Sequence, residues 1–318
     1  MFAISVAAPA GASADLLYSQ VGSGTNDLVS ADVANNANDS QGADDFTVPP
    51  GQVWNLSSVD VFGGSLTGGM AGTDTANVFL YANSGTLPGS QLFQQNGITT
   101  GATATAAGQE IDFTAALTGP PALTPGDYWV SVQSSGPYRW AWEILNGGQQ
   151  GNSAVWQNPG GGLGQGCPSY TPIHSCGVAA TVGSDFFFRL NGTAANSNFS
   201  LGQPKLKSRY VINQPATFSG AGSAVVTDAA SSGRAGRATA RAKKNIKKAT
   251  IAIAGAGTRN LPLKLTNNAK KKLKKGKTVK LRAVITFTAT GGVPVSLNSK
   301  IKLIPRRSAR PARIASAN

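Results

Sequence analysis

Short runs of alternating apolar and polar residues recur along the chain, and turn residues separate them. Within residues 15–192 the runs include VWNLSSVDVF, ANVFLY, YWVSVQ and SDFFFRLNG, with Pro, Gly, Asn and Asp between them. A period of two places successive side chains on opposite faces of a strand, and such punctuation is typical of antiparallel sheets. The pattern predicts an all-β fold, with a jelly-roll-like β-sandwich over residues 15–192.

A second region of alternation follows, and here many of the polar positions hold basic residues. Residues 279–288 place apolar side chains on one face, with Lys280 and Arg282 on the other. Residues 300–303 repeat this arrangement. One face of such a strand packs in a core while the other is solvated. We therefore predict a smaller, antiparallel, Ig-like β-sandwich over residues 205–305.

The 5 tryptophans all lie in the first of these regions. Alternation places Trp140 and Trp142 on one face together with an isoleucine, which favours packing in the core. Trp129 shares its face with polar residues, and Trp156 precedes the loop QNPGGGLGQGCPSY, which ends at Tyr170. Flat aromatic rings stack on sugars, so Trp129, Trp156 and Tyr170 are the candidate ligand-binding residues. Core packing is the alternative for the tryptophans.

Charge changes sign abruptly near residue 195. Through residue 200 the chain has 2 basic and 13 acidic residues, and from residue 201 onward it has 26 basic residues and one acidic residue, Asp228. The net charge of +14 hides this division. So sharp a change predicts a domain boundary, with a linker over residues 193–204 and a basic, disordered tail over residues 306–318.

The basic half contains two dense clusters of lysines. They consist of Lys243, Lys244, Lys247, Lys248, Lys270, Lys271, Lys272, Lys274, Lys275 and Lys277. Three interpretations compete: a solvated face, retention on anionic envelope polymers or glycans, and binding of nucleic acid. Proteins that bind single strands stack bases on aromatic rings, and this half has few such rings. Lysine is also a point charge rather than a bidentate phosphate ligand, so we favour anionic polymers and do not expect nucleic acid.

The N-terminus and the cysteines both indicate export. Residues 1–14 are mostly small and apolar and end in Ala-Ser-Ala, which predicts an incomplete signal peptide; an ordinary N-terminus is the alternative. Cys167 and Cys176 are the only 2 cysteines, too few for a zinc site, so we predict that they form a disulfide. No apolar run is long enough to span a membrane. We expect a secreted or cell-surface protein.

Several motifs resemble known modules. FTVPPGQVWNLSSVDVFGG, NVFLYANSGTLPGSQLF, LTPGDYWVSVQ, WQNPGGGLGQGCPSY and DFFFRLNG, in this order, resemble a β-sandwich module of secreted bacterial proteins. FSLGQPKL and the later run NNAKKKLKKGKTVKLRAVITFTATGGVPVSLNSKIKL resemble Lys-rich, Ig-like modules at the C-termini of exported bacterial proteins. The resemblance implies an exported, surface-associated protein, and it supplies no catalytic residues.

The acidic stretch before residue 46 contains carboxylates that suit a metal ion. Asp27, Asp44 and Asp45 are candidate ligands of a structural Ca²⁺, because this ion prefers carboxylate and amide oxygens. Their spacing is not that of an EF-hand, and a solvated acidic loop is the alternative. We expect no other cofactor.

The sequence offers little catalytic chemistry. It has one histidine, it lacks a G-x-S-x-G motif, and its Gly-rich GGGLGQG lacks the Lys of a phosphate loop. Glu110, Asp112 and Glu143 are conceivable glycosidase carboxylates, but their spacing singles out no pair. We predict a non-enzymatic adhesion-type protein whose first domain binds a partner such as a glycan and whose basic domain is held on envelope polymers. A secreted polysaccharide-acting enzyme, or its accessory carbohydrate-binding module, is the alternative.

Overall fold

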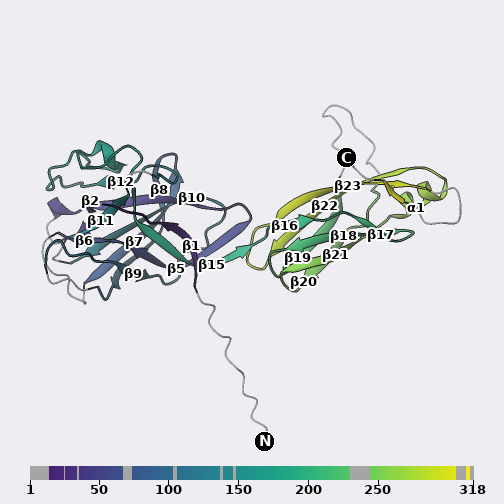
Figure 1. Cartoon of the computed structure of the whole chain (residues 1–318), viewed down its shortest axis with the longest axis horizontal. Helices are drawn as coiled ribbons and strands as arrows, with labels where there is room; N and C mark the ends of the chain where they lie inside the picture. The colour runs from purple at the N-terminus through teal and green to yellow at the C-terminus, as the bar shows by residue number, and fades with distance from the viewer. Residues whose placement is uncertain are drawn as a thin grey trace, which may run out of the picture. The chain divides into compact units, whose positions relative to one another are not determined.

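The computed structural model describes residues 14–24, 26–33, 36–66, 74–102, 106–136, 139–145, 148–229, 244–305 and 313–315. The chain divides into two compact units: unit 1 comprises Met1–Pro50 and Trp54–Ala194, and unit 2 comprises Gly51–Val53 and Ala195–Asn318. Strands dominate both units, and the described residues contain one α-helix (Figure 1). The all-β prediction is confirmed. Residues 1–13 of the predicted signal peptide lie outside the described residues.

The largest sheet of unit 1 has seven strands. Six of them follow the order β13 (Thr171–Pro172), β12 (Val155–Gln157), β4 (Gln41–Val48), β10 (Gly126–Ser135), β7 (Thr75–Ser84) and β8 (Leu87–Thr99). The remaining strand, β3 (Ala31–Asp32), pairs with β10 in parallel. Because β4 lies between β12 and β10, its acidic residues are placed inside the sheet rather than at an edge.

Two four-stranded sheets complete unit 1. The first has the order β1 (Asp15–Gln20), β15 (Phe188–Asn196), β5 (Gln52–Val61) and β9 (Phe113–Ala116). In the second, β11 (Trp140–Leu145) pairs with β14 (Asp185–Phe186), β2 (Asn26–Val29) and β6 (Gly63–Ser65). Short 3₁₀ helices, η1 (Asn36–Asn38) and η2 (Ile173–Ser175), lie in the connections.

The core of unit 1 is rich in aromatic side chains. Trp140 and Trp142 are fully buried, as the alternation predicts. The ring of Trp142 stacks on Phe186 with 4.6 Å between centroids, and its indole nitrogen donates a 2.6 Å hydrogen bond to the carbonyl of Phe187. The apolar surface of this buried indole is therefore packed, and its one polar atom is hydrogen-bonded.

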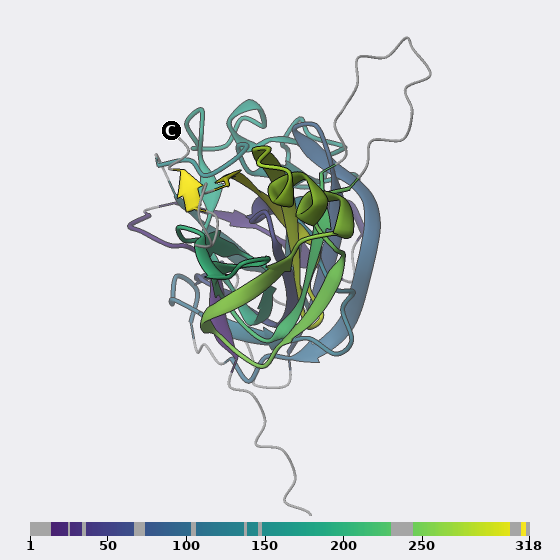
Figure 2. The same ribbon diagram turned by 90° about the vertical axis from the view of Figure 1, so that its right-hand side faces the viewer.

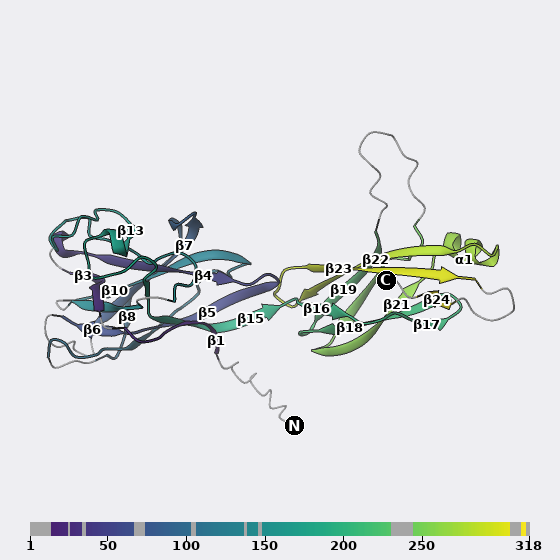
Figure 3. The ribbon, with the colours of Figure 1, turned by 45° about the horizontal axis from the view of Figure 1, so that its top comes forward.

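Unit 2 contains two sheets, which Figure 3 shows together with the helix. In the four-stranded sheet, β18 (Val211–Phe218) pairs with β16 (Phe199–Leu201), β17 (Lys205–Ser208) and β21 (Gly257–Lys264). The five-stranded sheet has the order β20 (Ala249–Ile253), β19 (Gly222–Asp228), β22 (Val279–Ala289), β23 (Val295–Ile304) and β24 (Arg313–Ala315). Buried side chains from both sheets form one core, separate from that of unit 1.

The lysine-rich run after residue 266 forms helix α1 (Asn267–Lys274), which the strand pattern did not predict. Thr266 caps its N-terminus, because its side-chain oxygen accepts a hydrogen bond from the backbone nitrogen of Ala269 at 3.3 Å. Ala269 and Leu273 lie one turn apart and are both buried, so they fix the helix to the core. Figure 2 shows α1 in the foreground of unit 2.

Two segments predicted to lack regular structure contain strands. In the expected linker, β15 continues to Asn196, and β16 pairs with β18 so that Phe199 lies opposite Phe218. In the expected tail, β24 pairs with β23, while residues 306–312 lie outside the described residues. Partners distant in sequence supply the backbone hydrogen bonds of these strands, so local composition gave no sign of them. In the described residues, no helix has the length and apolar character needed to cross a membrane.

Candidate functional site

The two candidate tryptophans are buried and present no ring face to solvent. Trp129 has 0% exposure, and its indole nitrogen donates to the side-chain oxygen of Asn83 at 2.8 Å. Trp156 also has 0% exposure and donates to the carbonyl of Val29 at 2.6 Å. The expectation of an exposed stacking platform is therefore wrong, because other segments cover the face on which alternation placed Trp129. The core-packing alternative describes both rings.

The third candidate, Tyr170, lies half-buried beside these residues. Its ring meets that of Tyr81 edge to face, with 6.1 Å between centroids, and packs against the small cluster that contains Trp129 and Val155. Burial raises the pKa of the Tyr170 phenol well above its ordinary value, so the group is neutral at physiological pH. Tyr170 thus helps to cover the aromatic cluster.

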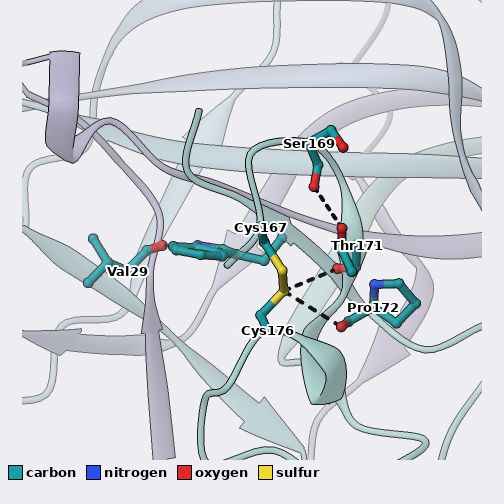
Figure 4. Close-up of a disulfide and its surroundings, with 7 residues drawn as sticks. Val29, Cys167, Ser169, Thr171, Pro172 and Cys176 are labelled. Carbon is teal, nitrogen blue, oxygen red and sulfur yellow. Dashed lines mark hydrogen bonds between the residues drawn. A yellow bond between two sulfur atoms is a disulfide. The ribbon is translucent and has the colours of Figure 1, made fainter. Parts of the chain in front are cut away.

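Cys167 and Cys176 form a disulfide, which confirms the predicted pairing (Figure 4). Both residues are buried, and they close a loop between positions 9 apart in sequence. The sulfur of Cys176 lies 3.7 Å from the carbonyl oxygens of Thr171 and Pro172. A disulfide sulfur carries no proton, so these are packing contacts. The bond fixes the segment that holds Tyr170 over the sheet.

Asp44, Asp45 and Asp185 form a buried acidic cluster where the seven-stranded sheet meets the sheet that contains β14. Asp44 on β4 is fully buried and accepts hydrogen bonds from the side chain of Gln20 at 2.7 Å and the backbone nitrogen of Phe186 at 2.6 Å. Burial, and next the neighbouring Asp185, raise the pKa of Asp44 well above its ordinary value. Burial likewise raises the pKa of Asp185 to about 7 and also raises that of Asp45. This cluster therefore holds protons that exposed carboxyls would release.

A second acidic cluster joins the carboxylates that sequence spacing could not group. Glu143 on β11 lies directly opposite Asp27 on β2, and the bridge between Gly64 and Glu110 brings Glu110 alongside. Burial, and then the neighbouring carboxylates, raise the pKa values of Asp27 and Glu143. The pKa of Asp112 is also raised by burial, against the opposing effect of its hydrogen bond from Gly63.

These two clusters do not combine the residues proposed for calcium. Asp27 belongs to the second cluster, whereas Asp44 and Asp45 belong to the first. Across the described ranges, no group of three or more His, Cys, Asp or Glu side chains is arranged to hold a metal ion. The residues present therefore do not fit the predicted Ca²⁺ site.

The strongly basic surface lies at one end of unit 2. There the turn before β18, the end of β21, helix α1 and the start of β22 come together. We call this region the basic end. Every cation in it except Lys270 is exposed, and the described members are Lys205, Lys207, Arg209, Lys244, Lys247, Lys248, Lys264, Lys270, Lys271, Lys272, Lys274, Lys275, Lys277, Lys280, Arg282, Lys300 and Lys302.

The structure brings the two predicted lysine clusters together. The side-chain oxygen of Thr266, which caps α1, donates to the carbonyl of Lys244 at 2.8 Å. Its backbone nitrogen donates to the carbonyl of Asn245 at 2.9 Å. The segment 244–248 is thereby fixed beside the helix that carries the second cluster. Lys243 lies outside the described residues.

Asp228, the one acidic residue of this half, does not neutralise the cations. Its carboxylate accepts hydrogen bonds from the backbone nitrogens of Asn245 and, at 2.9 Å, Ile246. The carboxylate thus anchors the lysine-bearing segment 244–248 to the end of β19. Its charge stabilises the position of these lysines while leaving their ammonium groups available.

Among the described residues, the opposite end of unit 2 carries little charge, with Arg259 on β21 the cation nearest to it. Residues 212–227, 249–258 and 283–299 contain no Lys, Arg, Asp or Glu. The register places their turns together, since Gly222 lies opposite both Ile253 and Ala289. The described cations are therefore concentrated at one end of unit 2 rather than spread evenly over it.

No family model matches the sequence, and no curated protein matches it. Among solved structures, a β-glucuronidase of Faecalibacterium prausnitzii is 12% identical and has a TM-score of 0.17, with 81% of this chain and 37% of that chain covered. DesR, a β-glucosidase from Streptomyces venezuelae solved with D-glucose, is 10% identical with a TM-score of 0.19, covering 89% and 50%. The chain thus spans half or less of these proteins, and such weak similarity carries no argument about activity.

Proposed function

We propose that this protein is an exported, non-enzymatic envelope protein that unit 2 holds on anionic polymers. The observation that supports it is the concentration of exposed cations at the basic end, where the one carboxylate bonds backbone amides. A surface crowded with like charge repels itself, and binding a polyanion relieves that repulsion and releases counterions. The disulfide of unit 1 is compatible with an oxidising, extracellular environment.

Unit 1 has a different part in this proposal. It is displayed at the surface and binds a partner, with a glycan as the candidate. We take unit 1 to be a jelly-roll-like sandwich and unit 2 to be an Ig-like one. A glycan array probed with the full chain tests the candidate partner, and binding that persists in high salt assigns it to unit 1 rather than to the basic end.

Retention is tested with the full-length protein on dextran sulfate beads and on neutral dextran beads. We expect binding to the sulfated beads at low salt, release by 1 M NaCl, and no retention on neutral dextran, because the Debye length falls to about 3 Å in 1 M salt. Equal retention on both beads, or protein that stays bound in 1 M salt, overturns the proposal.

A polysaccharide-acting enzyme is the second candidate, and the cluster of Asp27, Glu110, Asp112 and Glu143 favours it. A glycosidase needs one carboxyl group that keeps its proton, and burial with neighbouring carboxylates raises the pKa of Glu143. Release of new reducing ends from a polysaccharide, abolished by Glu143→Gln, supports this candidate. Unchanged release in the variant, or no release by the wild type, rejects it.

A further inference from the structure

Four cations of the basic end form a block on the outer face of the five-stranded sheet. The register of β22 and β23 places Lys280 directly opposite Lys302, and Arg282 directly opposite Lys300. All four side chains are exposed and alternate with buried residues, so they point away from the core. We call these four residues the cation tetrad.

The tetrad is unfavourable for the fold by itself. Like charges at directly opposite positions of an antiparallel pair destabilise the sheet, and here two such pairs are adjacent. The nearest carboxylate along the chain, that of Asp228, lies on the opposite face of its strand, in phase with the buried Ala224 and Val226. Further along the same two strands, the directly opposite residues are Thr286 and Ser296, whose hydroxyls form a hydrogen bond of 2.7 Å. Four adjacent cations without a carboxylate on the same face of the sheet therefore indicate a surface that binds an anion.

The tetrad is continuous with the rest of the basic end. The side chain of Asn245 donates to the backbone carbonyl of Lys280 at 3.3 Å, which places the segment 244–248 beside the tetrad. The same segment is bonded to the cap of α1, so cations extend from the sheet face to the helix. An occupant long enough to follow this path meets cations along its whole length, whereas a single small anion meets only those at one point of it.

The spacing within the tetrad fits a chain of separated charges. Opposite residues of an antiparallel pair have Cα atoms about 4.5–5.5 Å apart, and alternate residues along a strand lie about 7 Å apart. An extended polymer with one phosphodiester per repeat of a few backbone atoms presents its charges at intervals of this order.

The chemistry around the tetrad favours a polymer without rings. The outer face beside it bears Val284, Thr286 and Asn298, none of which can stack on a sugar or a base. The aromatic ring of Tyr210, at the basic end, already has Arg209 and Lys270 over it at 5.5 Å and 5.2 Å. Recognition at this surface therefore rests on charge and spacing.

We propose that the cation tetrad binds successive phosphates of a linear, acyclic polyol phosphodiester polymer, such as poly(glycerol phosphate), which continues over the basic end. This inference rests on the proposed function and names its polymer class. Phosphodiesters stay ionised at all physiological pH values, and the lysine side chains engage them as point charges. The other cations of the basic end extend the contact in both directions.

The test measures binding of the full chain to poly(glycerol phosphate), to polygalacturonate with the same number of charges, and to single-stranded DNA in 0.15 M salt. We expect poly(glycerol phosphate) to bind at least about 10-fold more tightly than the other two. Replacing the tetrad by Lys280→Gln, Arg282→Gln, Lys300→Gln and Lys302→Gln lowers that affinity at least about 10-fold and reduces the slope of log K against log salt by about 3.

The control compares two single variants that change the charge equally, Arg282→Gln in the tetrad and Arg259→Gln, an exposed arginine of β21 that is not part of the basic end. We expect Arg282→Gln to lower the affinity about 2-fold and Arg259→Gln to leave it nearly unchanged. Unfolding curves confirm that both variants are folded. Equal losses in the two variants overturn the tetrad as a site, and tighter binding of polygalacturonate or DNA overturns the polymer class. Equal losses, or tighter binding of polygalacturonate, leave the proposed function intact, whereas tightest binding of DNA, or no binding to any of the polyanions, rejects it as well.

Discussion

The two units place their charges in opposite ways. Unit 1 buries carboxyl groups in clusters, as with Asp44 and Asp185, and each of these two accepts a hydrogen bond from an amide nitrogen. Unit 2 keeps nearly all of its described cations exposed and uses its single carboxylate to fix the backbone. Buried charge is coupled to the folding equilibrium, whereas exposed charge remains available to a partner. We therefore expect changes of charge to alter stability in unit 1 and binding in unit 2.

The largest effect tests whether the two cores are independent. Trp142→Ala removes a fully buried ring that stacks on Phe186, so we expect unit 1 to lose about 3–5 kcal/mol of unfolding free energy. Calorimetry should show one transition shifted to lower temperature and the other unchanged. The matched variant in unit 2 is Phe287→Ala, which should shift only the other transition. If either variant shifts both transitions together, the units do not fold independently.

The pH dependence of stability should also separate the units. The carboxyl of Asp185 has a folded pKa of about 7, raised by burial, so folded unit 1 binds more protons than unfolded unit 1. Its stability is then greatest below the unfolded pKa near 4 and falls as the pH rises through about 7. We expect a loss on the order of 2–3 kcal/mol in unit 1 between pH 4 and pH 8.

The matching change is Asp185→Asn, which removes the titrating group and should flatten this pH dependence. Asp15→Asn, at an exposed position on β1, is the control and should leave the slope as it is. The transition of unit 2 should be nearly independent of pH over the same range. A unit 1 that gains stability between pH 5 and pH 8 contradicts the effect assigned to the buried cluster.

Removal of the disulfide should have a smaller effect on stability, and only in unit 1. It closes a short loop, so replacing both cysteines by serine should cost about 2–3 kcal/mol in the chain-entropy model. Reduction of the wild-type protein should lower the same transition by the same amount, measured by calorimetry with and without reductant. The double variant is the control, because its midpoint should not respond to reductant. A shift of the unit 2 transition contradicts this assignment.

Sequence patterns predict features that depend on neighbouring residues. Alternation correctly places Trp140 and Trp142 in the core, and the cysteine content correctly predicts the bond between Cys167 and Cys176. Alternation also assigns Trp129 to a polar face, but it cannot show that a disulfide-closed loop covers that face. A period of two reports which side of a strand a residue occupies and not what packs on that side.

Features that need strand register could not be predicted. Asp27 and Glu143 are far apart in sequence and meet only because β2 pairs with β11. Similarly, the alternation shows that Lys280 and Lys302 face outward, but the pairing that sets one opposite the other depends on how the two strands align. Acidic and basic composition indicated which half holds each charge, and register determines which charges act together.

The substitution with the smallest expected effect on stability is Lys302→Glu in the tetrad. It gives the sharpest test, because the stability of unit 2 should rise while its affinity for the polymer falls. Lys302→Glu converts a like-charge pair with Lys280 into an opposite-charge pair, so unit 2 should gain about 0.2–1 kcal/mol in denaturant unfolding. Lys205→Glu changes the net charge equally but lies opposite the neutral Asn213, and it should give no such gain. The same Lys302→Glu variant should bind poly(glycerol phosphate) more weakly than the Lys205→Glu variant does. If the tetrad served only solubility, Lys302→Glu would not be expected to lower the affinity for the polymer while raising the stability of unit 2. A lysine that destabilises the fold but strengthens binding is explained by the partner it binds. A Lys302→Glu variant that gains stability without losing affinity for poly(glycerol phosphate) would contradict this explanation.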